Sequence, residues 1–350
     1  MIEASLVTQR YLHFTNSRKN YPRMFGDEPK LPAMTLATAC YRLMFRDCAK
    51  LTSAPDLPAT SLKIKCYAHM FEGCSSMTKA PALLAEALRD SCYAYMFKDC
   101  SALSSVTMMA RNNYSGASYC WLDGVGAFGT LSKHESAVLA EDSVSGVPTG
   151  WEVNETPIEW DAIPVDLGLS VKWSAYNLGA TRPEETGCFF AWGETEIKGA
   201  YSWETYKWCR GTNNTLTKYC TNNEYGVVDG KTILELSDDA AHAHLGGGWR
   251  VPSREEWQEL VANCTWQMEE INNLPVVRLT STVPGYTDKS IILPYDAGVE
   301  GETLHAGTGG AYWSSTANHS LRAFRSLFNT TVTESPGLKC YGRLIRPVSD

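Results

Sequence analysis

A repeat of 26 residues constrains the fold of this chain more than any other feature of its sequence. The segments that begin at Leu31, Leu57 and Leu83 read LPAMTLATACYRLMFRDCAKLTSAPD, LPATSLKIKCYAHMFEGCSSMTKAPA and LLAEALRDSCYAYMFKDCSALSSVTM. Six of the twelve cysteines follow the period in two series, Cys40, Cys66 and Cys92, and Cys48, Cys74 and Cys100. A fixed period in the twenties is typical of a solenoid, because each unit has an apolar face that it buries only by stacking on its neighbours.

Each repeat predicts one short helix and one short strand. The apolar residues of the first copy recur at helical spacing, namely Cys40, Tyr41, Met44, Phe45 and Cys48. The following segment KLTSAP predicts the strand. We interpret the stacked cysteines as small buried side chains rather than disulfides or a metal ladder, since neither a CxxC pair nor neighbouring histidines accompany them.

The repeat motif CYxxMFxxC, followed by LTxAPxLPATxL, resembles the BspA-like leucine-rich repeats of bacterial surface proteins. The resemblance covers about residues 21–108, with a shortened copy from Tyr21 that lacks its second cysteine, as if the array were cut at its start. Residues 109–155 resemble the segment that closes such arrays. The resemblance therefore implies a leucine-rich-repeat array with a C-terminal cap over residues 1–155.

The composition changes after the repeats. Residues 156–164 lie in the proline-bearing stretch NETPIEWDAIP and predict a linker, and residues 165–350 form a second, tryptophan-rich domain without the period. In this domain Ser253 and Glu256 form a capping box before the apolar residues of a helix. SDDAAHAHL predicts a second short helix that ends at Gly246, and SIILPY and GRLIRPV predict strands. The fold class expected for this domain is α+β.

Charge and hydropathy exclude several classes of partner. The chain has 350 residues, of which 44 % are hydrophobic and 20 % charged, with a formal net charge of -8. No block of clustered Lys and Arg is present, which argues against nucleic acid and anionic membranes as partners. No apolar run approaches the roughly 20 residues of a membrane span, so no membrane insertion is expected. The first residues lack the pattern of a secretory signal.

The sequence offers little support for catalysis. His242 and His244 are two residues apart, whereas a metal site on a helix prefers a spacing of four. The glycines of LGGGWRVP lack the lysine of a phosphate loop, and no serine has a GxSxG setting. Cys209 and Cys220 flank a polar loop and either form a disulfide or remain a free pair. We therefore expect no catalytic residues, no metal and no cofactor.

Several blocks of the second domain, among them DLGLSVKWSAYNLGA, FFAWGETE, GGGWRVPSREEWQEL, YWSS and GRLIRPV, resemble the C-type-lectin-fold domains of gut bacterial surface and phage proteins. The resemblance covers about residues 165–349 and extends to formylglycine-generating-enzyme-like proteins. It implies a compact α+β module in which the first and last strands pair. The chain lacks both EPN and WND, so calcium-dependent sugar binding is not expected.

The segment AYWSSTANHSLRAFRSLFNTT, residues 311–331, predicts a strand with an unusual outward face. Alternation places Phe324, Ser326 and Phe328 on the core side. The outward row, Ala323, Arg325, Leu327 and Asn329, mixes a cation, an apolar side chain and an amide, whereas solvated faces are mostly charged or small and polar. An ordinary strand whose Leu327 packs under a loop is the alternative.

This segment is similar to the diversified region in the variable proteins of diversity-generating retroelements, although Phe324 stands where tryptophan is usual. The resemblance implies ligand-binding residues at Tyr312, Trp313, His319, Leu321, Arg322, Arg325, Leu327, Asn329, Lys339 and Arg343. A protein ligand would favour Leu321, Arg325 and Leu327, because interface centres combine arginine with apolar area. A glycan would favour Tyr312, Trp313 and Asn329.

The sequence thus predicts a non-enzymatic recognition protein that binds a protein or a glycan through its C-terminal segment. It is expected outside a bacterial cell, on the cell surface or on a phage particle. The alternative is an adhesin or carbohydrate-binding module that binds through its repeats.

Overall fold

The computed structural model describes residues 31, 33–111, 116–139, 144–272, 274–306, 309–328 and 332–350. Its internal contacts divide the chain into two compact units, Met1–Pro157 and Ile158–Asp350, each of which is described by itself. The division falls within the segment predicted as a linker. The shortened repeat copy predicted from Tyr21 lies outside the described residues.

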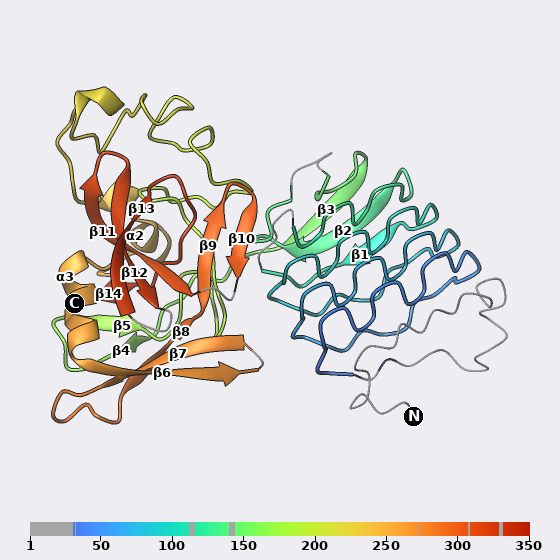
Figure 1. Ribbon diagram of the computed structural model, residues 1–350, viewed down its shortest axis with the longest axis horizontal. Helices are drawn as coiled ribbons and strands as arrows, with labels where there is room; N and C mark the ends of the chain where they lie inside the picture. Colours follow the sequence, from blue (N-terminus) through green and yellow to red (C-terminus); the bar gives the residue numbers. More distant parts are fainter. Residues whose placement is uncertain are drawn as a thin grey trace. The chain divides into compact units, whose positions relative to one another are not determined.

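The regular strands of the first unit begin at the end of the third repeat. They are β1 (Ser105–Thr107), β2 (Gly129–His134) and β3 (Trp151–Thr156), which pair in parallel in the order β1-β2-β3. Thr130 is paired with Ser105 on one side and with Glu152 on the other. In Figure 1 the repeats run as successive coils, coloured blue to green, and end in these strands. Residues 109–155, expected to be a cap, therefore continue the pairing that the third repeat begins.

The segment of each repeat predicted as a helix is a run of tight turns. Its backbone N–H groups alternate between two kinds of partner. Cys40 N–H donates to the Ala37 carbonyl at 3.3 Å, three residues back, whereas Tyr41 N–H donates to the Cys66 carbonyl of the next repeat at 2.9 Å. Ala39, with a φ of 56°, has a left-handed backbone, as do the equivalent positions of the later copies. An α-helix uses its N–H groups within the same segment. The helix prediction was therefore wrong, because half of the donors bind the neighbouring repeat.

The predicted short strand forms in the third copy alone among the repeats that the structure describes. In the first copy, KLTSAP has no regular strand, and in the second copy Lys79 makes an isolated bridge to Ser105. In the third copy the equivalent residues are β1, which has β2 as a regular partner. The strand therefore depends on its neighbour and not on the repeat sequence alone.

The aromatic and cysteine side chains stack along the repeats. The Phe45 and Phe71 rings lie 5.4 Å apart between centroids, and the Phe71 and Phe97 rings 5.8 Å apart, both nearly parallel. The Cys74 thiol donates to the Phe45 carbonyl at 3.1 Å, and the Cys100 thiol to that of Phe71 at 3.0 Å. All twelve cysteines of the chain are free, and five of the six repeat cysteines are buried, Cys40 being half-buried. The interpretation of these cysteines as small packed side chains is confirmed.

The second unit consists of four small antiparallel sheets and a few short helices. The strands are β4 (Pro164–Val165), β5 (Lys172–Ser174), β6 (Cys264–Ile271), β7 (Leu274–Ser281), β8 (Ser290–Pro294), β9 (Asp296–Glu300), β10 (Thr303–Ala306), β11 (Gly310–His319), β12 (Arg322–Phe328), β13 (Val332–Leu338) and β14 (Val348–Ser349). The sheets have the orders β14-β5-β4, β6-β7-β8, β10-β9 and β11-β12-β13. The helices are α2 (Ala240–Leu245) and α3 (Arg254–Ala262), with 3-10 turns η3 (Asn223–Tyr225) and η4 (Leu236–Asp238). The first and last strands of the unit lie in one sheet, because β5 pairs with both β4 and β14.

Both helices predicted in the second unit form. The start of α3 and the end of α2 fall where the sequence predicts, but α2 begins at Ala240, three residues after the start of SDDAAHAHL. Ser253 caps α3 in a complete capping box with Glu256, and the helix buries Trp257 and Leu260. Asp239 caps α2, which stops at Gly246. Both helix predictions are confirmed.

The predicted fold class, a leucine-rich-repeat solenoid followed by an α+β domain of C-type lectin fold, was wrong. Within the described ranges, α-helix is limited to α2 and α3, of 6 and 9 residues, and the other regular structure is mostly small antiparallel sheets. The repeats stack but do not close into a regular solenoid with a helix and a strand in every turn. In the second unit, long irregular segments are held by hydrogen bonds from side chains to backbone carbonyls. Trp192 Nε1, for example, donates to the Ser314 carbonyl at 2.8 Å.

The sheet β11-β12-β13 occupies the centre of the second unit. Figure 1 shows α3 on one side of this sheet and the hairpin β9-β10 on the other, and both elements contact it. One core cluster joins Trp257 of α3 to Phe328 of β12, and another joins Trp313 of β11 to Ala323 of β12. The middle of the sheet is therefore buried on both faces.

Candidate ligand-binding surface

The strand β12 carries the residues that the sequence singles out, and both of its neighbours are antiparallel. Arg325 pairs with Trp313 of β11 and with Ser335 of β13. The expected division into a buried and an outward row agrees with the burial of Ser326 and Phe328 and with the half-buried Arg325 and Leu327. It fails at two positions, because the sheet is covered on both sides. Phe324, expected in the core, is half-buried under the Arg254 guanidinium at 4.1 Å, whereas Ala323, expected outside, is fully buried.

Tyr312 and Trp313 do not reach the surface. Tyr312 is fully buried, and its hydroxyl donates to the Pro294 carbonyl at 2.7 Å. Trp313 is 1 % exposed, and its indole N–H donates to the Phe190 carbonyl at 2.9 Å. The expectation that these two side chains form an aromatic platform for a ligand is wrong, because the core needs them as hydrogen-bonded packing residues.

Lys339 is also buried, at 1 % exposure. Its ammonium group donates to the Tyr219 carbonyl at 2.9 Å and lies 4.6 Å from the centre of the Trp192 ring. Burial lowers the pKa of Lys339 to about 7, a shift that the neighbouring Cys220 and Asp229 oppose. The expectation that Lys339 contacts a ligand is wrong, because Trp192 and Tyr219 enclose its ammonium group.

Arg343 is 2 % exposed and has a partly satisfied guanidinium. Its Nη2 donates to Glu300 Oε1 at 2.5 Å, and its Nη1 to the Gly342 carbonyl at 3.2 Å. The guanidinium lies 5.3 Å from the centre of the Tyr341 ring, and its Nε has no hydrogen-bond partner among the described residues. Burial lowers the pKa of Arg343, against the opposing effect of Glu300. The expectation that Arg343 contacts a ligand directly is therefore wrong, because the residue is buried. Its positive charge still acts on the surface above it.

The remaining predicted residues lie at or near the surface. His319 and Arg322 are exposed, and Leu321, Arg325 and Leu327 are half-buried. These five residues are called the recognition surface below. Asn329 lies outside the described residues. Burial lowers the pKa of His319, helped by the charges of Arg322 and Lys339, so the imidazole is held toward its neutral form.

The turn between β11 and β12 fixes the end of the recognition surface. His319 pairs with Arg322 across the hairpin, and Leu321 N–H donates to His319 Nδ1 at 3.2 Å. The Leu321 carbonyl accepts from Lys339 N–H at 3.0 Å, which ties the turn to the segment after β13. Arg322 Nη1 donates to the Pro336 carbonyl at 3.2 Å. Backbone and side-chain hydrogen bonds therefore tie the turn to β13 and to the segment that follows it.

Arg325 lies across the neighbouring strand β13. A Cβ placed on Gly337 would come within 3.0 Å of Arg325 Cδ and 3.1 Å of its Nε, so the glycine makes room for the arginine stem. The Nε is buried and has no hydrogen-bond partner among the described residues. Burial lowers the pKa of Arg325 to about 10, and the charge of Arg343 acts in the same direction. The charge of Glu300 opposes this shift, but within the described part of the chain the Arg325 side chain makes no hydrogen bond or ion pair.

Sequence reasoning missed Tyr341 and Glu300, which lie beside these arginines. Tyr341 stands two residues before Arg343, so strand alternation would have placed both side chains on one side of an extended segment. Glu300 is 43 residues from Arg343, and nothing in the sequence links the two. Glu300 comes from β9, whose Val299 exchanges backbone hydrogen bonds with Gly342.

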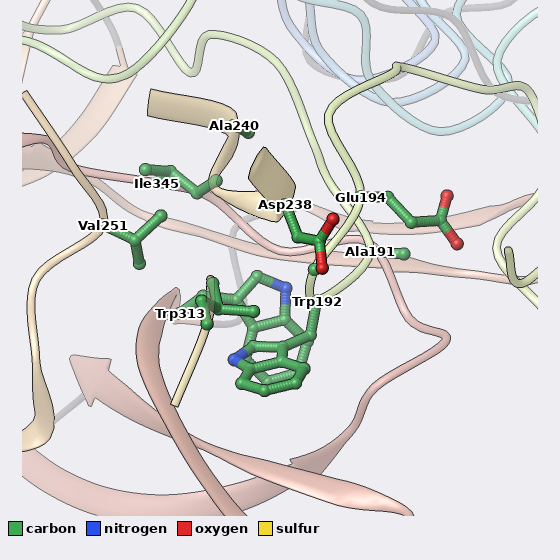
Figure 2. Close-up of a pocket in the computed structure, with 10 residues that line it drawn as sticks. Ala191, Trp192, Glu194, Asp238, Ala240, Val251, Trp313 and Ile345 are labelled. Atoms are coloured by element: carbon green, nitrogen blue, oxygen red, sulfur yellow. The ribbon is translucent and has the colours of Figure 1, made fainter. Parts of the chain in front are cut away.

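A small pocket lies elsewhere in the second unit, with an empty volume of about 190 Å³ that includes open solvent. Figure 2 shows Trp192 and Trp313 at its wall, with the Asp238 carboxylate beside them and that of Glu194 directed away. Both carboxylates are engaged, Glu194 by Lys198 at 2.8 Å and Asp238 by Lys218 at 2.5 Å. The space is below the roughly 300 Å³ of common ligand pockets.

The described residues contain neither a metal-binding cluster, nor a membrane-spanning helix, nor a disulfide. No group of three or more His, Cys, Asp or Glu side chains is placed to hold a metal ion. No helix in the described ranges has the length and hydropathy to span a membrane. Cys209 and Cys220 are both free thiols, so the loop between them is not closed by a disulfide.

Comparisons with protein-family models, curated proteins and solved structures found no match to this chain.

Proposed function

We propose that the second unit is a non-enzymatic recognition module that binds a protein partner through the recognition surface. The observation that carries the proposal is the contrast between the two sets of predicted ligand residues. Tyr312 and Trp313, which a glycan would need, are buried, whereas Leu321, Arg325 and Leu327, which a protein would need, reach the surface. Arginine next to apolar side chains is the composition of protein interface centres.

The rigidity of this region supports the same function. The recognition surface is mounted on a three-stranded sheet whose middle is buried on both faces. A surface held in place before binding loses little conformational entropy on association. The resemblance of residues 311–348 to the variable proteins of diversity-generating retroelements adds the proposal that binding residues here are exchanged by mutation. It also favours action outside a bacterial cell, on its surface or on a phage particle.

A display experiment tests this function without a known partner. The full chain is immobilised and used to select binders from a random 12-residue peptide library. The selected peptides are then mapped by hydrogen exchange. We expect protection of backbone amides in 319–327, and loss of binding in the double variant Leu321→Asp and Leu327→Asp. Selected peptides that protect other segments only, or a library that yields no binder, would count against the proposal.

A second candidate function rests on a separate observation in the first unit. The rings of His69 and Tyr95 stack at 4.5 Å, and Tyr119 meets Tyr95 edge-on at 5.4 Å. His69 and Tyr95 are half-buried and Tyr119 is exposed. A row of aromatic faces can contact sugar rings, so this candidate is glycan binding by the repeats. Binding of oligosaccharides that is lost in Tyr95→Ala and Tyr119→Ala would support it over the first.

A further inference from the structure

The arginines at the recognition surface outnumber the acceptors beside them. The arginine patch is defined as Arg322, Arg325 and Arg343, with the Tyr341 ring next to Arg343. Glu300 is the carboxylate that contacts this patch in the described part of the chain, and it is bound by Arg343. The positions of the second unit that the structure does not describe carry no charged residue in the sequence. The patch therefore has excess positive charge.

A second buried arginine shows how this chain satisfies a guanidinium that has only a structural role. Arg346 is fully buried, and each of its three nitrogens has an acceptor. Its Nε donates to Asn177 Oδ1 at 3.0 Å, and its Nη1 to the Ser174 carbonyl at 3.0 Å. Its Nη2 donates to the Ile292 carbonyl. Buried polar groups are normally satisfied in this way.

Arg325 differs from Arg346 in every one of these respects. No hydrogen bond or ion pair of its side chain is found among the described residues, and its Nε is buried without a partner. Its stem lies over Gly337. The like charges of Arg343 and Arg322 lower the pKa of Arg325, and the charge of Glu300 acts in the opposite direction. Leaving a buried donor unpaired is unfavourable, and a like-charged neighbour adds to the cost. Nη1 and Nη2 of Arg325 are not among the buried unpaired atoms, and an anion that binds them would offset the like charges.

We infer that the arginine patch binds a carboxylate side chain, Asp or Glu, of a protein partner, with Arg325 as the residue that pairs with it. The inference rests on the proposed function and names the chemistry of its central contact. A planar carboxylate matches the fork of N–H donors on a guanidinium, which no described acceptor occupies on Arg325. Leu321 and Leu327 lie on either side of Arg325 in the sequence, and both are half-buried, so each exposes some apolar area. Charge complementarity selects an acidic segment over a basic or neutral one.

The test uses matched probes and arginine-specific nuclear magnetic resonance. The full chain is labelled with ¹⁵N-arginine, and the Nε–Hε signal of Arg325 is assigned with Arg325→Lys. Glutarate is titrated against glutaramide, which has the same length and no charge. We expect a saturable shift of the Arg325 signal with glutarate and none with glutaramide. The Arg254 signal should stay unchanged, because Arg254 is paired with Glu334 at 2.7 Å.

The peptide arm compares Leu-Glu-Leu and Leu-Gln-Leu tripeptides with acetylated N-termini, and a glucuronate disaccharide. We expect the Glu peptide to bind at least about 10-fold more tightly than the Gln peptide, and Arg325→Gln to remove this difference, while Arg254→Gln retains it. Equal effects of glutarate and glutaramide, or of the two peptides, would overturn the inference. Tighter binding of the disaccharide would overturn the assignment to a protein partner.

The two proposals fail in different ways. If selected peptides protect 319–327 but lack acidic residues and bind Arg325→Gln unchanged, the carboxylate contact is wrong and the recognition surface stands. If the selected peptides protect no part of 319–327, the recognition surface itself is wrong.

Discussion

Replacement of Lys339 by methionine should change how the stability of the second unit depends on pH. The lysine is buried against Trp192 and Tyr219 without an ion pair among the described residues, and its pKa falls from 10.5 to about 7. Between these two values the unfolded chain binds a proton that the folded chain does not. Stability therefore rises with pH in this window and is lowest below pH 7, where the folded state carries the buried charge.

The slope of this effect is about 1.4 kcal/mol per pH unit for one group that titrates fully. The cation–π contacts of the ammonium with the two rings offset part of the cost of burial, by about 0.5–2 kcal/mol. We therefore expect the free energy of unfolding of the native chain, relative to Lys339→Met, to rise by about 1–2 kcal/mol between pH 7 and pH 9. Cysteine and tyrosine ionisation is shared by both chains and largely cancels in the difference.

The assay is urea unfolding of the full chain followed by tryptophan fluorescence, which reports mainly on the second unit because only Trp121 and Trp151 lie in the first. Lys207→Met is the matched control. Lys207 also lies over an indole, 4.7 Å from the Trp208 ring centre, but it is exposed. The difference in free energy of unfolding between Lys207→Met and the native chain should not change with pH. A flat or falling difference for Lys339→Met would refute the argument, because the ammonium would then be as stable inside the unit as in water.

Three further substitutions test the packing arguments, each by urea unfolding monitored by circular dichroism. Arg346→Met should lower the free energy of unfolding by more than about 3 kcal/mol, since it removes three hydrogen bonds of a fully buried guanidinium. A loss below about 1 kcal/mol would contradict the structural role given to this residue. Ser253→Ala should cost about 1 kcal/mol through loss of the α3 capping box, and no change would mean that tertiary packing alone holds this end. Gly73→Ala should cost about 1–3 kcal/mol, because φ is 75° and the new Cβ would meet Asp47 Oδ1 at 2.7 Å. Adding Asp47→Gly should restore part of that loss, and an unchanged loss would assign the whole effect to backbone strain.

The sequence predicted the features that depend on local chemistry. The period of 26 residues, the capping box of α3 and the end of α2 at Gly246 each follow from residues close together in the chain. The short helix of the repeat was wrong because turns and helices place apolar residues at similar spacings. A helix and these turns differ in the acceptors of their backbone N–H groups. The Tyr41 N–H donates to a carbonyl in the next repeat, not to one in its own segment.

The sequence predicted the exposure of a site residue correctly only where neighbours in the sequence determine that exposure. Arg322 lies at a hairpin turn, and the turn itself keeps it exposed. Lys339 and Arg343 look like surface cations in the sequence, but Tyr219, 120 residues away, and Glu300, 43 residues away, enclose them. Tyr312 and Trp313 were misplaced for the same reason, since covering both faces of a sheet is a property of the assembled unit.

The alternation of hydrogen bonds in the repeats gives the stack a direction. Ala39, Tyr41 and Leu43 donate N–H groups forward to Ile64, Cys66 and Ala68 of the next repeat, and the following copy does the same. By the same geometry, the alternate carbonyls of each copy face backward. A duplicated 26-residue copy inserted between two described repeats would find carbonyls ahead of its N–H groups and N–H groups behind its carbonyls. Duplication within the array therefore keeps the hydrogen-bond polarity of the stack unchanged.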